Sequence, residues 1–343
     1  MKHIGFDVDS SMTHISVFND RGQEVQRTQV PTREADLVAF MMSIAGAKQV
    51  ALEESQMADF VTRIIEPYAT KVIRCLPQHN RLISQSEKKC DREDARSLAE
   101  LLYLGRLKAV HHSPWVYRQL REGVRAYWRA SRDLARSKSR LKAFCLFNGL
   151  HCTGEKVYSR RYRKRYVAWI EKAAGNQALL EQLYGEMDFC RARKAAHIKI
   201  LRELVKPFRQ DERCLKTLPG VGFIGACTLI AYLEGGWRVG NKRRLWTYCG
   251  VGIRRHESHA TGHRGASRQG NRYLKTVVMT AAVSISSDRM PDNLLALTWH
   301  RQICRGVPPA RARRNVARKV AVLAQHCLRF KQEYDNARVT TTP

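Results

Sequence analysis

Short stretches that alternate between apolar and polar positions dominate the first part of the chain. Residues 3–9 alternate and are apolar enough for a β-strand, and further strands are expected over residues 13–18, 24–30 and 71–76 and over the short apolar run 49–53. The segment 19–22, with the sequence NDRG, has the composition of a hairpin turn between the second and third strands. The first three strands are therefore expected to form a meander.

Apolar residues at helical spacing occur around the later strands. Leu37, Phe40 and Met41 fall on one stripe of a helix expected to end near Ile44, and a second helix is expected to end at Ile65. The run 95–102 (ARSLAELL) has the same spacing. A meander followed by strand–helix alternation predicts a mixed α/β sheet flanked by helices, in the order of a ribonuclease-H-like domain.

Long helical periodicity begins at about residue 115. Residues 116–147 carry apolar side chains every three or four positions, and a further helical stretch runs from about 177 to 208, which predicts an arm of long helices such as an antiparallel coiled coil. Later helices are expected over residues 243–249, 273–285 and 311–330. The predicted domains are an α/β domain (1–114), a helical coiled-coil arm (115–212) and a mostly α-helical C-terminal domain (213–343).

The charge balance indicates the class of partner. The chain has 61 Lys and Arg against 31 Asp and Glu, a formal net charge of +30, which would repel itself in a compact protein unless a polyanion binds. Nucleic acid is the leading candidate, because Lys and Arg that neutralise phosphates supply most non-specific affinity. No apolar run approaches the roughly 20 residues of a membrane span, so no membrane partner is expected.

The N-terminus and the cysteines predict the cellular location. The opening residues, MKHIGFDVDSS, are acidic where a signal peptide would be apolar. The ten cysteines include no C-x-x-C pair and are expected to be reduced thiols. A cytoplasmic, nucleoid-associated location is therefore expected.

Four acidic residues form a candidate metal site. Asp91 and Asp94 lie three apart, on one face of the first turn of a helix, where Mg²⁺ would offset their mutual repulsion better than the helix dipole can. Ordinary helix capping is the competing interpretation. Asp7 lies within the first strand and Glu53 ends the fourth, so three elements supply an Asp, Glu, Asp, Asp set of the kind that holds divalent ions for phosphoryl transfer.

Two neighbouring acids are alternative ligands. Asp9 should share the side of Asp7 by strand alternation, so it could be the true ligand or a second one. Glu54 is the corresponding alternative to Glu53.

A basic, aromatic stretch at residues 155–170 is a candidate nucleic-acid surface, since cations that track phosphates and rings that stack on bases suit a single strand. Its cations, Arg160, Arg161, Arg163, Lys164 and Arg165, alternate with Tyr158, Tyr162, Tyr166 and Trp169. The alternative is a solvated basic helix face whose aromatic residues pack internally.

The sequence LPGVG, at residues 218–222, looks like the hairpin of a helix–hairpin–helix element. Gly220 and Gly222 would let backbone N–H groups approach a phosphate at a helix N-terminus. A plain loop before a buried helix is the competing interpretation.

A polar, glycine-rich loop at residues 254–271 contains the candidate nucleophile. Ser258 stands among basic residues that would stabilise developing charge on a phosphodiester; Ser267 and Thr261 are weaker candidates. The basic residues are Arg254, Arg255, Arg264 and Arg268. The three histidines, His256, His259 and His263, lack the Cys or carboxylate that would complete a tetrahedral metal set.

Taken together, these motifs resemble those of the insertion-sequence 110 family of transposases. GFDVD around Asp7 resembles the family's G-I-D-[VT] strand, EES at Glu53 its E-A-[TS], and KCDREDA at Asp91 and Asp94 its K-T-D-x-x-D-A. PGVG and the segment from Gly250 to Ser258 resemble its P-G-[IV]-G and G-L-x-P-R-x-Y-[EQ]-S-G motifs. The chain departs from the family pattern at Gln56, Ile253 and His259.

The resemblance implies a recombinase with a RuvC-like domain and a C-terminal serine transposase domain. Asp7, Glu53, Asp91 and Asp94 would bind Mg²⁺, and Ser258 would form a phosphoserine–DNA intermediate. The implied partners are donor and target double-stranded DNA, a structured bridge RNA and further copies of the chain in a dimer or tetramer.

Three other functions remain open from the sequence. A Piv-like site-specific DNA invertase shares these motifs and would need no RNA. A RuvC-type nuclease would use water as the nucleophile, and a basic RNA- or DNA-binding scaffold would need no metal.

Overall fold

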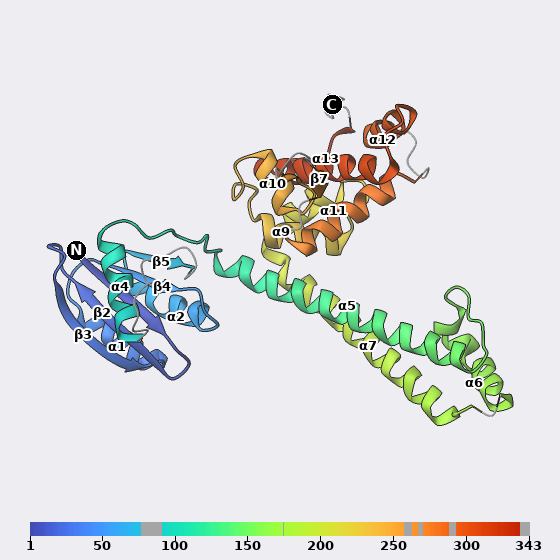
Figure 1. Ribbon diagram of the computed structural model, residues 1–343, viewed down its shortest axis with the longest axis horizontal. Helices are drawn as coiled ribbons and strands as arrows, with labels where there is room; N and C mark the ends of the chain where they lie inside the picture. Colours follow the sequence, from blue (N-terminus) through green and yellow to red (C-terminus); the bar gives the residue numbers. More distant parts are fainter. Residues whose placement is uncertain (77–90, 174, 257–262, 267–269, 288–292, 337–343) are drawn as a thin grey trace. The chain divides into compact units, whose positions relative to one another are not determined.

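A computed structural model describes the chain apart from residues 77–90, 174, 257–262, 267–269, 288–292 and 337–343 (Figure 1). Its contacts divide the chain into two compact units, Met1–His112 and Ser113–Pro343. Within the described residues, no helix is both long and apolar enough to cross a membrane.

The first unit is built on one five-stranded sheet. Its strands are β1 (Lys2–Val8), β2 (Met12–Phe18), β3 (Glu24–Pro31), β4 (Lys48–Glu53) and β5 (Lys71–Cys75), in the spatial order β3-β2-β1-β4-β5. The β1–β2 and β2–β3 pairs are antiparallel, whereas β4 is parallel to both β1 and β5. The five predicted strands and the mixed α/β sheet are confirmed.

The predicted hairpin turn joins β2 to β3. The side-chain oxygen of Asn19 accepts hydrogen bonds from the backbone N–H groups of Arg21 and Gln23. Gly22 has a φ of +76°, a conformation that costs glycine little. The turn is thus closed by the residue types that predicted it.

Two helices, α1 (Glu34–Ser43) and α2 (Ala58–Ile65), cover one face of the sheet. Alternate residues of β1 and β4, such as Phe6 and Leu52, are fully buried against Leu37 and Val61 of these helices. A short 3₁₀ turn, η1 (Glu66–Tyr68), follows α2. This face holds the main apolar core of the unit.

The other face of the sheet is covered by α4 (Asp91–Tyr103), whose backbone lies directly against β1. A Cβ atom built on Gly5 would be 2.0 Å from the carbonyl oxygen of Ala95 and 2.6 Å from the nitrogen of Ala99. At the other end of the helix, the rings of His3 and Tyr103 are 5.5 Å apart. The helix therefore runs antiparallel to β1, with its first turn toward the C-terminal end of that strand.

The second unit begins with two long antiparallel helices, α5 (Trp115–Phe147) and α7 (Gln177–Leu204) (Figure 1). Ion pairs join Arg193 to Asp133 and Arg140 to Glu186 across them. The helix α7 ends before Pro207, which cannot continue the backbone ladder, and a 3₁₀ turn, η5 (Lys206–Phe208), follows. The predicted long helices are confirmed.

Three short elements connect the C-terminal end of α5 to the N-terminal end of α7: η3 (Lys156–Tyr158), η4 (Arg160–Tyr162) and α6 (Arg163–Lys172). Leu141, Ile170 and Tyr184 form a small core there. The basic aromatic stretch of the sequence is therefore part of a folded cap on the helix pair.

The rest of the unit is a bundle of helices: α8 (Arg209–Lys216), α9 (Phe223–Leu233), α10 (Lys242–Tyr248), α11 (Arg272–Ile285), α12 (Leu294–Cys304) and α13 (Pro309–Phe330). Every residue of α9 from Ala226 to Leu233 is buried, and Val316 and Val320 of α13 join the same core. The mostly helical C-terminal region is confirmed, and α12 adds a helix to it.

A two-stranded antiparallel hairpin, β6 (Ile253–His256) and β7 (His263–Ala266), stands where the sequence predicted only a loop. That prediction was wrong because the two strands are short and carry charged residues in place of an apolar alternation. Their backbone pairing, for example Arg255 with Arg264, does not depend on such an alternation.

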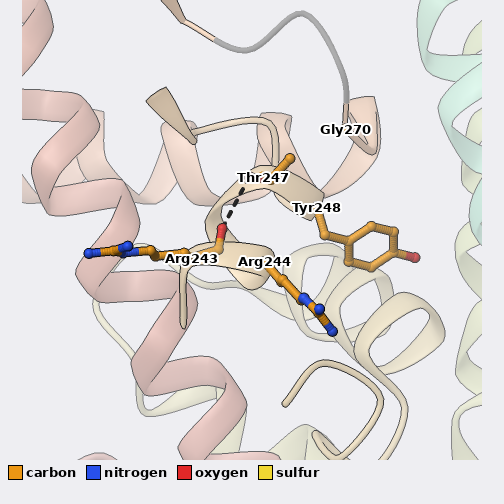
Figure 2. A pocket seen from close by; sticks show the side chains of 5 residues that line it. All are labelled: Arg243, Arg244, Thr247, Tyr248 and Gly270. Atoms are coloured by element: carbon orange, nitrogen blue, oxygen red, sulfur yellow. Dashed lines mark hydrogen bonds between the residues drawn. The ribbon is translucent and has the colours of Figure 1, made fainter. Parts of the chain in front are cut away.

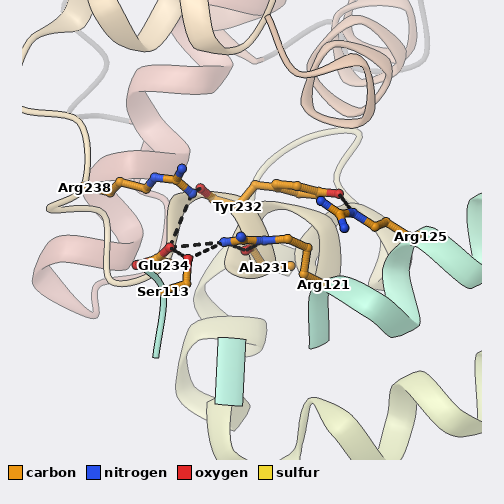
Figure 3. Close-up of polar contacts among 7 residues, drawn as sticks. All are labelled: Ser113, Arg121, Arg125, Ala231, Tyr232, Glu234 and Arg238. Carbon is orange, nitrogen blue, oxygen red and sulfur yellow. Dashed lines mark hydrogen bonds and ion pairs between the residues drawn. The ribbon is translucent and has the colours of Figure 1, made fainter. Parts of the chain in front are cut away.

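The start of α5 is fixed to the end of α9 by buried polar contacts (Figure 3). Glu234 ends α9 with a φ of +56° and accepts a hydrogen bond of 2.6 Å from Ser113. Arg121 donates to Ser113, to Glu234 and to the carbonyl oxygen of Ala231, and Arg238 pairs with Glu234 from the other side. Burial, with Arg238 nearby, lowers the pKa of Arg121, and the charge of Glu234 acts in the opposite direction.

Gly5→Ala tests the contact between α4 and β1. The added methyl group would collide with the backbone of α4, so we expect a loss of about 1–3 kcal/mol or more in the free energy of unfolding, measured by denaturant titration of the first unit's signal. Gly185→Ala, at an open position on α7, is the control for a glycine substitution without a steric clash and should gain about 0.5–1 kcal/mol, measured on the signal of the second unit, to which α7 belongs. Equal effects of the two substitutions would contradict the close packing.

Candidate functional site

Asp7 and Glu53 lie side by side on the sheet face that α4 covers. The parallel register pairs Gly5 with Ala51 and Phe6 with Leu52, so the next positions on the two strands are Asp7 and Glu53. Strand alternation puts these two residues on the face of Gly5 and Ala51. Ala51 packs with Leu98 of α4, which identifies that face.

The first turn of α4 reaches the same edge of the sheet. Ala95 lies over Gly5, and the helix runs antiparallel to β1, so Asp94 lies toward the strand end that carries Asp7. Asp91 is the first residue of α4; only its backbone is described. The backbone therefore brings β1, β4 and α4, the three elements of the predicted acid set, to one edge.

Ion pairs hold the first turn of α4 against the strands. Arg27 of β3 lies 2.8 Å from Glu24 and 3.1 Å from Glu93 of α4. Hydrogen bonds from Arg27 hold the pKa of Glu24 below its usual value, so that carboxylate stays charged. These contacts fix the neighbour of Asp94 in the helix and thereby orient the turn.

The donor chemistry of this edge suits a hard divalent cation. Asp7, Glu53 and Asp94 offer only carboxylate oxygens, and Mg²⁺ is held in proteins by one or two carboxylates with water and substrate phosphates. Among the side chains that the structure describes, no group of three or more His, Cys, Asp or Glu residues is arranged to hold a metal ion. The side chain of Asp91 is not among them.

The alternative ligand Asp9 has another role. Strand β1 ends at Val8, one residue before Asp9, so the expectation that Asp9 shares the side of Asp7 stays a prediction. Its Oδ2 accepts hydrogen bonds from the backbone N–H of Ser11 and the hydroxyls of Ser10 and Ser11. The backbone N–H groups of Ser10 and Ser11, together with these hydroxyls, lower the pKa of Asp9. The residue closes the turn between β1 and β2.

The alternative ligand Glu54 belongs to the opposite side of the sheet. It lies 2.6 Å from the guanidinium of Arg74, a residue of β5 that is only 5% exposed, and Asp59 of α2 pairs with the same arginine. A buried arginine needs such partners, because an unpaired buried charge is costly. Glu53 and Glu54 therefore face different surroundings although they are adjacent in sequence.

The predicted nucleophile Ser258 lies outside the described residues, as do Thr261, His259, Ser267 and Arg268. The strands on either side of it are described by their backbone. Arg254, Arg255 and His256 belong to β6, and His263 and Arg264 belong to β7. The hairpin thus brings the backbones of three of the four predicted basic residues together.

The two glycines of the predicted helix–hairpin–helix element differ in environment. Gly220 has a φ of +73° and lies against α11, where a Cβ would be 2.7 Å from the Cα of Ala281. Gly222 is exposed, has open space around it and precedes the first turn of α9. The turn does join two helices, and only Gly222 leaves room for a ligand.

The basic residues of the arm differ in whether a carboxylate of α7 pairs with them. Arg160 and Arg163 lie 3.6 Å and 2.9 Å from Asp188 of α7. Arg161, Lys164 and Arg165 are exposed. The aromatic residues differ in exposure: Tyr158 is buried in the arm's core, whereas Trp169 is 43% exposed with Arg165 over its ring.

Sequence reasoning missed a pocket beside the hairpin, lined by Arg243, Arg244, Thr247, Tyr248 and Gly270 (Figure 2). The adjacent arginines were a visible signal. Their relation to Gly270 is not visible in the sequence, because it depends on how the hairpin returns to α10.

Comparison with known proteins gives two family matches, the first over the first unit and helix α5 and the second within the rest of the second unit. Residues 4–147 match a family model of DEDD transposases of the IS110 type, and residues 212–295 match the family described as "Transposase IS116/IS110/IS902 family". The chain belongs to the IS110 family of transposases. The resemblance drawn from the motifs is confirmed.

A curated relative of this IS110-family chain is "Putative transposase y4qE" of Sinorhizobium fredii, with 26% identity over 199 residues. The matched stretch covers 57% of this chain and 47% of that protein. The IS110-family chain thus spans about half the length of this relative.

Glu54→Gln tests whether Glu54 serves the ion pair with Arg74 while Glu53 serves as a metal ligand. It leaves Arg74 with one carboxylate partner, so we expect a loss of about 1–2 kcal/mol in the free energy of unfolding, since Glu54 is partly exposed. Glu53→Gln is the control and should cost less stability but weaken Mg²⁺ binding, followed by calorimetry. A loss of Mg²⁺ binding in Glu54→Gln alone would contradict the assignment.

Proposed function

We propose that this IS110-family protein is the DNA transposase of a mobile element and acts as a recombinase that cuts and rejoins DNA strands. The observation that carries the proposal is the meeting of Asp7, Glu53 and the first turn of α4 at one edge of the sheet. A strand order of β3-β2-β1-β4-β5 with an antiparallel meander and two parallel strands is what a ribonuclease-H-like, RuvC-like domain requires.

In this proposal Asp7, Glu53, Asp91 and Asp94 hold Mg²⁺. When bound, the ion supplies positive charge that stabilises the phosphate oxygens during transfer. The protein's own contribution is positional: Gly5 sets the approach of α4, and Arg27 holds its first turn through Glu93. The close approach at Gly5 sets how near the carboxylates lie, and the exposed Arg27–Glu93 pair adds a weaker restraint.

Ser258 is the nucleophile of the proposed reaction. Its Oγ forms a bond to phosphorus, the bond from phosphorus to the leaving strand oxygen breaks, and that oxygen takes up a proton while the serine loses one. The phosphoserine–DNA intermediate keeps the energy of the phosphodiester for strand exchange. Arg254, Arg255, Arg264 and Arg268, on the strands and segments around Ser258, would stabilise the charge that develops.

The proposed partners are nucleic acids and further copies of the chain. A net charge of +30 suits donor and target double-stranded DNA and a structured bridge RNA. The exposed Arg161, Lys164 and Arg165 at the end of the arm, with Trp169 beside them, and Gly222 before α9 are the proposed contacts. We propose that two or four protomers assemble, so that acids and serine act as a composite site.

Ser258→Ala tests the chemistry. We expect no covalent protein–DNA adduct from this variant, because the proposal assigns the bond to phosphorus to the hydroxyl of Ser258, whereas the wild-type protein should give an adduct visible on a denaturing gel with labelled DNA and Mg²⁺. Asp91→Asn is the companion variant and should lose recombination in Mg²⁺ while keeping Ser258. Adducts from Ser258→Ala, or free 5′-phosphate ends from both proteins, would instead indicate another nucleophile or water.

The RNA partner is tested by purification from the host. We expect a structured non-coding RNA to co-purify with the full chain, and sequencing should identify it. Adding matched donor and target DNA in Mg²⁺ should then give recombinants that depend on this RNA. Recombination that persists after complete RNA digestion would favour a DNA invertase that needs no RNA.

A further inference from the structure

A pocket of about 430 Å³ lies at the base of the β6–β7 hairpin, lined by Arg243, Arg244, Thr247, Tyr248 and Gly270 (Figure 2). Its volume is within the range of pockets that hold small ligand groups. The five lining residues include two guanidinium groups and no carboxylate. Such a lining suits an anion.

The two arginines are available to a ligand. Both are exposed, and within the described part of the chain neither guanidinium has an ion-pair partner. Arg163 on the arm, by contrast, is held by Asp188. A guanidinium without a carboxylate keeps its donors for phosphate oxygens, which it can bind in a bidentate fashion.

The side chains extend from α10 in different directions (Figure 2). The hydroxyl of Thr247 donates a hydrogen bond of 3.1 Å to the carbonyl oxygen of Arg243, which keeps this turn of the helix closed. The arrangement therefore suits neighbouring phosphates of one strand better than a single phosphate held between both arginines.

The backbone enters and leaves the hairpin at this pocket. A Cβ on Gly252 would be 2.8 Å from the hydroxyl oxygen of Thr247, and one on Gly270 would be 2.6 Å from its carbonyl oxygen. The backbone N–H of Asn271 donates a 2.7 Å hydrogen bond to the carbonyl oxygen of Tyr248. The residues at both ends of the segment 253–270 thus pack against α10, the helix that carries Arg243 and Arg244.

We propose that Arg243 and Arg244 bind neighbouring backbone phosphates of the DNA strand that the protein processes. The assignment to DNA rests on the proposed function, since the chain between the two anchored ends, Gly252 and Gly270, contains the proposed nucleophile in its sequence. Arg243 and Arg244 are positioning residues, which hold the strand and do not touch the reacting atoms.

The test measures the affinity of the protein for DNA and does not depend on strand cleavage. Full-length protein carrying Ser258→Ala is titrated with a short fluorescent DNA duplex of mixed sequence over a range of salt concentrations. Adding Arg243→Ala and Arg244→Ala should weaken binding by roughly tenfold or more. The slope of log affinity against log salt should fall in magnitude by about 1.8, or about 0.9 for each single substitution.

Two control variants separate phosphate contacts from general charge. Arg243→Lys with Arg244→Lys should keep the salt slope and regain only part of the affinity, because a lysine cannot bind phosphate in a bidentate fashion. Arg301→Ala with Arg305→Ala removes two exposed arginines that do not line the pocket and should change the slope less. Equal losses from the two alanine pairs would overturn the proposal.

The choice of DNA is tested with a single-stranded RNA probe of the same sequence. A loss of RNA binding with unchanged DNA binding in the Arg243→Ala, Arg244→Ala protein would overturn the DNA assignment. The titration measures DNA affinity and does not depend on strand cleavage. A wild-type protein that forms no serine adduct would therefore refute the proposed role of Ser258, and the effect of Arg243 and Arg244 on DNA affinity would be judged separately.

Discussion

The contact between Gly5 and the backbone of α4 determines where the acidic residues can lie. With the carbonyl oxygen of Ala95 only 2.0 Å from the place of a Cβ, no larger residue fits at Gly5 without moving the helix. A helix packed this closely brings its first turn to the end of β1, within the neighbourhood of Asp7 and Glu53. A helix held off by side chains would put Asp94 farther from both strands.

The two faces of the sheet give neighbouring acids different roles. Glu53 faces α4, whereas Glu54 turns to α2 and Arg74, so a one-residue step separates a candidate ligand from a structural ion pair. Asp9 follows the end of strand β1, and the hydroxyls of Ser10 and Ser11 donate hydrogen bonds to its Oδ2. The contacts of Asp9 and Glu54 support Asp7 and Glu53 as the functional pair of the proposal.

The parts of the fold that could be predicted are those with a regular apolar period. Five strands and the long helices α5, α7, α11 and α13 follow from that period, and Pro207 explains where α7 stops. The β6–β7 hairpin could not be predicted this way, since its strands are short and rich in charge. The order of the acids along the chain predicted a shared site, but the role of Gly5 appears only when α4 is seen on the sheet.

The pocket at α10 could not be predicted from the sequence for a related reason. Arg243 and Arg244 are two of 61 basic residues, and sequence alone gives no ground for choosing among them. The basic residues differ in their partners. Arg74 is buried and Arg121 partly buried, and both pair with carboxylates within the fold, while Arg160 and Arg163 share Asp188. An arginine that is already in such an ion pair binds a phosphate less readily, because the carboxylate must first be displaced. Net charge therefore predicts the class of partner, while the contacts of each guanidinium indicate where that partner binds.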